Sequence, residues 1–150
     1  MHKLVMIAVL GVFVTLSACK KDKDPSEETV QLGKLSDTWS LTSVSKDGTE
    51  KLGYDNFTLT LAGTQSADHF TYATSGRPEL SPWPVGGTWK FGNVQTQIIR
   101  DPGSIHELFI SYTLTNTELT MKFNFDGEGY RSNGRAASAE GSWIFTFNKQ

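Results

Sequence analysis

The sequence contains a single cysteine, at position 19, and this scarcity excludes two kinds of architecture. One cysteine can form neither an intramolecular disulfide nor a cysteine metal cluster, so packing has to hold the fold together. An excess of one charge is also missing, because 14 Lys and Arg residues stand against 16 Asp and Glu residues, for a formal net charge of −2. This near-balance lacks the basic footprint of nucleic-acid-binding proteins, so we expect no nucleic-acid partner.

Long apolar runs are scarce as well, and the longest extends from Leu4 to Leu16. Its thirteen residues fall short of the roughly twenty that a bilayer-spanning helix needs. The run follows His2 and Lys3 and has the length of the apolar core of a secretory signal peptide. We therefore predict a signal peptide over residues 1–18.

Small residues precede the cysteine in Leu16-Ser17-Ala18-Cys19, and this stretch resembles the lipobox of bacterial lipoproteins. The resemblance implies that the Cys19 thiol is acylated and that cleavage makes Cys19 the new N-terminus. Each lipid methylene that enters the membrane would then contribute roughly 0.8 kcal/mol. Lys20 in place of aspartate resembles outer-membrane sorting, so we expect a lipid anchor in the outer membrane, facing the periplasm or the cell surface. The alternative is an ordinary secretory signal with a chance cysteine.

The rest of the chain divides into a polar segment and a strand-rich domain. Residues 19–34 are charged and contain a proline, which predicts a flexible tether. From Leu35 onward the apolar period is two, and no convincing helical stripe occurs outside the signal peptide. Eight segments are predicted strands: 38–42, 57–61, 70–73, 88–91, 97–100, 108–114, 119–125 and 142–147. All of them alternate except 97–100, where Ile98 and Ile99 are adjacent. Short strands at this spacing predict an all-β domain over residues 35–150, an eight-stranded antiparallel up-and-down barrel, with a β-sandwich as the alternative.

Three predicted strands open alike, with Asp37-Thr38-Trp39, Gly87-Thr88-Trp89 and Gly141-Ser142-Trp143. The first resembles the Gly-x-Trp opening of lipocalin-like domains. The threonine-rich strands with a mid-chain Gly-Thr-Trp resemble lipocalin-like domains of Bacteroidetes lipoproteins. The resemblance implies a barrel that binds a small hydrophobic or amphipathic molecule. It also implies a cation stacked on Trp39, for which Arg100 is the candidate.

Aromatic residues are plentiful, and twelve of them fall on the predicted inward face of the strands. They are Trp39, Phe57, Phe70, Tyr72, Trp89, Phe91, Tyr112, Phe123, Phe125, Trp143, Phe145 and Phe147. Each such ring buries about 150–250 Å², and together they threaten to fill the interior of an eight-stranded barrel. A second function class therefore stays open, a structural or interaction lipoprotein whose filled barrel contacts another envelope protein or a glycan through its loops.

Two loops hold the remaining candidate residues. The loop from Gly76 to Gly87 contains three of the five prolines, and Trp83 lies between two of them. Because proline restricts the backbone, Trp83 is either a rigid recognition finger at the barrel mouth or a plug for the barrel end. The segment from Asp126 to Arg135 is rich in glycine and predicts a mobile hairpin loop. The predicted ligand-binding residues are Tyr72, Arg77, Trp83, Trp89, Tyr130 and Arg131.

No pattern for catalysis or for a metal centre is present. The histidines of the mature chain, His69 and His106, lack the two-histidine spacing of zinc sites, and Asp126 and Glu128 lack the spacing of an EF-hand. Neither a Gly-x-Ser-x-Gly elbow nor a Walker loop occurs. We therefore predict a non-enzymatic protein without a cofactor. Its expected partners are the membrane, through lipid on Cys19, and a small apolar ligand or an envelope protein.

Overall fold

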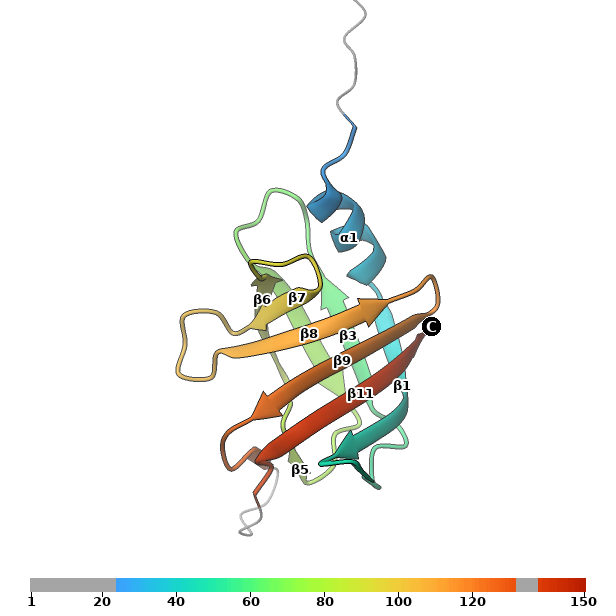
Figure 1. The fold of residues 1–150 in the computed structure, drawn as a ribbon, viewed down its shortest axis with the longest axis vertical. Coiled ribbons are helices and arrows are strands. Elements are labelled where there is room, and N and C mark those ends of the chain that lie inside the picture. Colours follow the sequence, from blue (N-terminus) through green and yellow to red (C-terminus); the bar gives the residue numbers. More distant parts are fainter. Residues whose placement is uncertain (1–23, 132–137) are drawn as a thin grey trace, which may run out of the picture.

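The computed structural model describes residues 24–131 and 138–150, which form a closed antiparallel β-barrel and one short helix (Figure 1). The eight barrel strands are β1 (Thr38–Lys46), β3 (Thr58–Ala62), β4 (Phe70–Ser75), β6 (Gly86–Phe91), β7 (Gln97–Arg100), β8 (Leu108–Leu114), β9 (Glu118–Phe125) and β11 (Gly141–Lys149). Each pairs with the next barrel strand along the chain, and β11 closes the barrel against β1. The predicted up-and-down barrel is therefore confirmed, and the β-sandwich alternative is wrong.

Three two-residue strands complete the fold outside the barrel wall. Strand β2 (Thr49–Glu50) folds back on β1 through a tight turn, in which Asp47 and Gly48 have φ values of 52° and 77°. Positive φ at both turn residues matches the right-handed twist of a hairpin. Strand β5 (Leu80–Ser81) pairs with β10 (Tyr130–Arg131) in a separate small sheet. This small sheet brings the proline-rich and glycine-rich loops to the same end of the barrel.

Helix α1 (Glu27–Leu35) corrects the prediction of a flexible tether over residues 19–34 for its part from residue 27 onward. The Ser26 side chain caps the helix by accepting a hydrogen bond from the Thr29 N–H, at 3.2 Å. Two acidic residues in the first turn and a lysine in the last turn complement the helix dipole. The charges that suggested a tether therefore stabilise the ends of a short helix. Residues 19–23 of the predicted tether, the predicted signal peptide over 1–18 and Cys19 lie outside the described residues.

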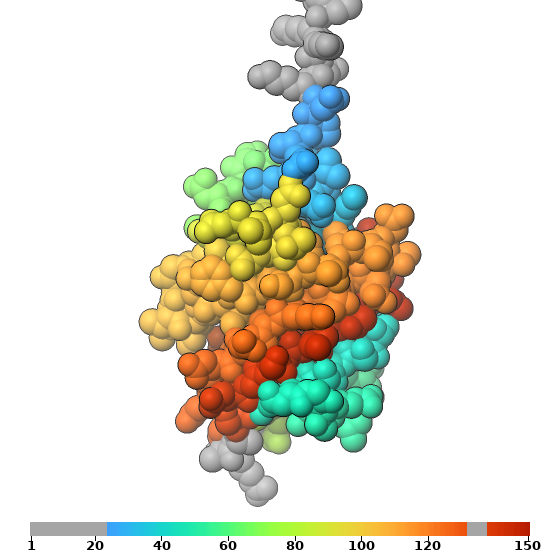
Figure 2. Space-filling view, viewed as in Figure 1, coloured from blue at the N-terminus to red at the C-terminus, as the bar shows by residue number. Residues whose placement is uncertain are grey.

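One end of the barrel is covered by α1. Leu32 and Leu35 are buried beneath the helix, and the Trp39 indole N–H donates to the Leu35 carbonyl at 2.9 Å. The loop after β6 lies beside the helix, as the space-filling view shows, and the Gln95 side chain there donates to Glu27 (Figure 2). Strands β1, β4, β7 and β9 run away from this covered end. The loops that follow β7 and β9 therefore lie at the opposite end of the barrel.

The barrel interior is filled by side chains. Ten of the twelve aromatic residues predicted to point inward are buried, and Phe91 and Phe125 are partly buried against them. Phe145 lies at the centre, with ring centroids 5.8 Å from Phe57 and 5.8 Å from Phe123. Such ring pairs contribute packing energy beyond the burial of area. The expectation that aromatic rings occupy the interior is therefore confirmed.

The cation above the first tryptophan is a lysine. The Lys149 ammonium lies 6.0 Å from the centre of the Trp39 ring and 2.8 Å from the Asp37 carboxylate. Arg100 ends strand β7 and contacts other rings, so its predicted stacking on Trp39 is wrong. Lys149 occupies the position because β11 pairs with β1 in a register that sets Lys149 directly opposite Trp39.

Acidification should weaken this contact between the first and last strands. The hydrogen bond from Lys149 and the N–H of Thr38 lower the pKa of Asp37. A carboxyl group whose pKa is lowered by folding stabilises the fold above its unfolded pKa, about 3.9, and loses this contribution as the pH falls through its folded pKa. Both side chains are partly exposed, so we expect an effect of at most about 1 kcal/mol. Urea unfolding at pH 7 and pH 3 measures how far the free energy of unfolding falls on acidification. This fall should be smaller in Asp37→Asn than in the parent protein, and equal falls would contradict the prediction.

Candidate functional site

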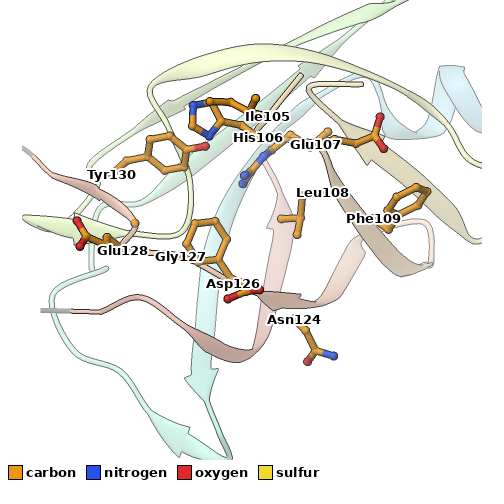
Figure 3. A pocket seen from close by; sticks show the side chains of 13 residues that line it. Ile105, His106, Glu107, Leu108, Phe109, Asn124, Asp126, Gly127, Glu128 and Tyr130 are labelled. Atoms are coloured by element: carbon orange, nitrogen blue, oxygen red, sulfur yellow. The ribbon is translucent and has the colours of Figure 1, made fainter. Parts of the chain in front are cut away.

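A cleft of about 600 Å³ opens at the end of the barrel away from α1. One wall is formed by Ile105 to Phe109, from the loop before β8 and the start of that strand. The other wall is formed by Asn124 to Glu128, and Tyr130 lies at one end of the cleft (Figure 3). This volume is within the range of about 300–1,000 Å³ that is typical of small-ligand sites. The cleft lies outside the aromatic interior, between loops that the barrel holds apart.

Arg100 lies at the base of this cleft and is almost completely buried, with 1% of its surface exposed. Its Nη1 group donates a hydrogen bond to the Pro82 carbonyl at 2.7 Å, and its Nε atom lies 3.4 Å from the Asp101 carboxylate. Within the described ranges, the Nε and Nη2 groups have no hydrogen-bond partner. A buried guanidinium with unused donors is costly unless an acceptor reaches it.

Aromatic rings enclose the guanidinium group. The Arg100 Cζ atom lies 5.3 Å from the ring centre of Trp83, 5.9 Å from that of Phe125 and 5.7 Å from that of Tyr130. These contacts stabilise the cation through the ring quadrupoles. Burial raises the pKa of Tyr130, and the nearby Arg100 charge opposes this shift. Tyr130 is therefore a neutral phenol at neutral pH, half-buried over the arginine.

Asp101 compensates the buried charge and is itself held on two sides. Its Oδ2 atom accepts a hydrogen bond from the Tyr72 hydroxyl at 2.8 Å, and its Oδ1 atom accepts one from the Thr88 N–H at 3.0 Å. The backbone of Asp101 has a φ of 49°, an uncommon conformation that aims the carboxylate back toward β6. Burial raises the pKa of Tyr72, so the phenol stays a donor at neutral pH. Tyr72 thus positions Asp101 beside Arg100.

The rim of the cleft has exposed apolar side chains on one side and carboxylates elsewhere. Ile105 is 96% exposed and Phe109 is 52% exposed, and both line the cleft. The carboxylates of Glu107, Asp126 and Glu128 also line it and are exposed to solvent. Exposed apolar groups next to polar ones are typical of surfaces that bind a ligand or a partner. The cleft can therefore hold a molecule with an apolar body and a polar group.

The structure places three of the six predicted ligand-binding residues around Arg100 and Asp101, namely Tyr72, Trp83 and Tyr130. Of these, Tyr130 lines the cleft, whereas Tyr72 and Trp83 are buried behind it. The interpretation of Trp83 as a recognition finger is wrong, because only 1% of its surface is exposed and its ring packs in the core. The alternative, a plug for the barrel end, is confirmed.

The other three predicted residues lie outside the cleft. Trp89 is fully buried and its indole N–H donates to the Thr71 carbonyl at 3.0 Å. Arg77 is half-buried and donates to the Trp83 carbonyl at 2.9 Å, which helps to hold the plug. Arg131 follows Tyr130 in β10 and is half-buried. The predicted hairpin loop from 126 to 135 is described only as far as Arg131.

Sequence reasoning missed Arg100 as the central residue of the site. A signal was present, because Arg100 lies two residues after Ile98 in a predicted strand and therefore points to the same face of the sheet. A charged residue at an inward position next to the Asp101-Pro102-Gly103 turn marks a strand end where a cation is buried. Ile105 and His106 could not be recognised, since they lie in a loop without periodicity.

Other types of site are not found in the described part of the chain. No group of three or more His, Cys, Asp or Glu side chains in residues 24–131 and 138–150 is placed to hold a metal ion. In the same ranges, no helix has both the length and the apolar character needed to cross a membrane. No protein-family model, curated protein or solved structure matches the chain. The case for a function therefore depends on the geometry of the cleft.

Proposed function

We propose that the protein is an outer-membrane lipoprotein that binds a small amphipathic molecule in the cleft above Arg100. The observation that carries this proposal is the cleft of about 600 Å³, with apolar residues at its rim and a buried guanidinium at its base. An apolar body would cover Ile105 and Phe109 and remove them from water, which is favourable by about 25 cal/mol for each Å². The lipocalin-like resemblance of the sequence supports a binding function, although the ligand would lie at the end of the barrel.

The placement of the cleft fits a protein that is anchored at its N-terminus. Helix α1 follows the proposed lipid site at Cys19 by seven intervening residues, and α1 covers one end of the barrel. The residues that line the cleft come mainly from the loops after β7 and β9. These loops lie at the opposite end of the barrel (Figure 1). A lipid on Cys19 would therefore keep α1 near the membrane and leave the cleft open to the surrounding solution.

The cleft can be tested with N-phenyl-1-naphthylamine, a neutral amphipathic dye that fluoresces in apolar surroundings. We expect saturable binding of one dye per protein, with a dissociation constant on the order of 100 µM or lower, since ligands of this size gain about 0.3 kcal/mol per non-hydrogen atom. Ile105→Ser should weaken binding about threefold by removing rim surface. Leu52→Ser is the matched control, because Leu52 is equally large, is 87% exposed and is not among the residues that line the cleft.

Two results would contradict the ligand-binding function. One is the absence of saturable dye binding to the folded protein. The other is an equal effect of Ile105→Ser and Leu52→Ser, which would place the dye elsewhere. Either result would favour the alternative function, a structural lipoprotein whose filled barrel contacts another envelope component.

Membrane attachment has a separate test in the intact chain. Cys19→Ser should move the protein from the membrane fraction to the soluble fraction, because the lipid supplies the membrane affinity. Fractionation of cells that express the two proteins measures this directly. If the serine variant stays in the membrane fraction, the proposal of a lipid anchor on Cys19 fails, whereas the proposal for the cleft does not depend on it.

A further inference from the structure

We propose that the ligand of the cleft carries one compact anionic group, such as a carboxylate or a sulfonate, that pairs with the Nη2 group of Arg100. This inference rests on the proposed ligand-binding function and names the chemical class of the ligand. A guanidinium offers five N–H donors. In the described ranges, Nη1 of Arg100 donates to the Pro82 carbonyl, whereas Nη2 has no hydrogen-bond partner.

The unused Nη2 group belongs to a side chain that lines the cleft, which is why the missing acceptor points to a ligand. A buried donor without a partner costs about 1–3 kcal/mol, and more when the donor is charged. Hydrogen bonds from arginine to carboxylates are roughly twice as strong as those between neutral groups. An anionic group in the cleft would therefore supply the acceptor that the buried Nη2 group lacks in the described residues. The pairing would form at a site that water reaches poorly.

One carboxylate lies beside Arg100 and others line the cleft, and their positions limit the charge of the ligand. Asp101 lies on the Nε side and is engaged with Tyr72 and Thr88. Glu107 is exposed and accepts a hydrogen bond from the Gly103 N–H at 2.6 Å. Exposed charges are screened by water and salt, so they oppose a buried ion pair only weakly. Together, these carboxylates disfavour a ligand with several negative charges but are compatible with a ligand that carries one.

The rings above Arg100 define how the anion would reach it. Tyr130 and Phe125 both line the cleft and both lie over the guanidinium. Tyr130 is the less constrained of the two, because it is half-buried in a two-residue strand that follows Gly127 and Gly129. Because Nη2 is itself buried, the Tyr130 ring would have to turn aside for an anion in the cleft to reach it.

A matched pair of dyes tests the charge of the ligand. 8-Anilinonaphthalene-1-sulfonate has the same ring system as N-phenyl-1-naphthylamine and adds one sulfonate. We expect the sulfonate dye to bind the protein about tenfold more tightly than the neutral dye. Phe109→Glu should reduce this ratio about twofold relative to Phe109→Gln, because the two replacements have nearly the same shape and differ in a charge that water partly screens. Phe109 is half-exposed at the rim, so both variants should fold.

Arg100 itself is tested in two ways. Arg100→Gln removes the positive charge and keeps a polar side chain, and it should bring the affinities of the two dyes within about twofold of each other. If this variant does not fold, nitrogen NMR of the arginine side chains in the unmodified protein gives the same information. The Arg100 resonances should then shift much more on addition of the sulfonate dye than on addition of the neutral dye.

The possible results separate this inference from the function on which it rests. Failure of both dyes to bind would contradict the proposed function. Binding of the neutral dye with equal affinity for the sulfonate would overturn only the anionic class. Tighter binding of the sulfonate with unchanged Arg100 resonances would also overturn the inference, because the anion would then lie elsewhere.

A free acid and a lipid headgroup offer the same anionic chemistry, and competition distinguishes the two sources. Dodecanoate below its micelle concentration should displace the sulfonate dye if the ligand is a free amphipathic acid. Vesicles of phosphatidylglycerol should displace it if the cleft takes a lipid headgroup. Displacement by either one supports the anionic class, and displacement by neither at saturating concentration would overturn it.

Discussion

Replacing Trp83 with alanine is expected to lower the free energy of unfolding by about 3–5 kcal/mol, which is typical for the loss of a large buried aromatic side chain. Trp83 is 1% exposed, and its ring lies edge-on to Phe123 at 5.9 Å and to Phe145 at 6.2 Å. It also supports the Arg100 guanidinium at 5.3 Å. The alanine variant would leave a cavity in the core and a buried cation with one ring fewer around it.

Thermal unfolding followed by circular dichroism should show this loss as a fall in Tm of roughly 10–20 °C for a domain of this size. Trp83→Phe is the matched control. The indole N–H of Trp83 has no hydrogen-bond partner in the described residues, so phenylalanine removes an unsatisfied donor as well as some volume. We expect this variant to cost less than about 1.5 kcal/mol. A Tm within a few degrees of the parent protein for Trp83→Ala would contradict the role of a plug.

The barrel could be predicted from the sequence because its strands follow a simple rule. In β9, residues alternate strictly between the interior and the solvent, so Leu119, Met121 and Phe123 are buried while Lys122 and Asn124 are exposed. The other barrel strands show enough of this alternation to be recognised, except β7, where Ile98 and Ile99 are adjacent and both buried. The two-residue strands β2, β5 and β10 could not be found, since a period of two needs more than two residues to appear.

The candidate site could be predicted only in part, because tertiary contacts define it. The sequence marks Trp83 as unusual through its flanking prolines, but proline restraint is equally compatible with an exposed finger and a buried plug. The structure decides between them through the pairing of β5 with β10, which carries the Trp83 loop across the barrel end. Tyr130 enters the cleft through the same pairing, and Arg100 gains its partner Pro82 from that loop.

Helix α1 escaped prediction for a physical reason as well. It is nine residues long and contacts the barrel mainly through Leu32 and Leu35, so it presents too narrow an apolar face for a helical period to be recognised. A helix of this length is marginal in isolation, and packing against the barrel has to stabilise it. The burial of these two leucines therefore determines whether residues 27–35 form a helix or a tether.

Leu35→Ala should consequently lower the free energy of unfolding by about 2–5 kcal/mol. Leu35 is completely buried, and its carbonyl accepts the hydrogen bond from the Trp39 indole. A smaller side chain at this position would leave a cavity between α1 and the barrel and would loosen the segment that holds Trp39 in place. Urea unfolding followed by tryptophan fluorescence measures the change.

Val30→Ala provides the control from the same helix. Val30 is 41% exposed, and alanine favours helix formation more than valine does, so this variant should stay within about 0.5 kcal/mol of the parent protein. If Leu35→Ala also stays within that range, α1 contributes nothing to the stability of the domain and residues 27–35 act as a tether after all. A large cost for Leu35→Ala alone would instead make α1 an integral part of the barrel. The barrel would then hold residues 27–35 rigidly against the end that lies opposite the cleft.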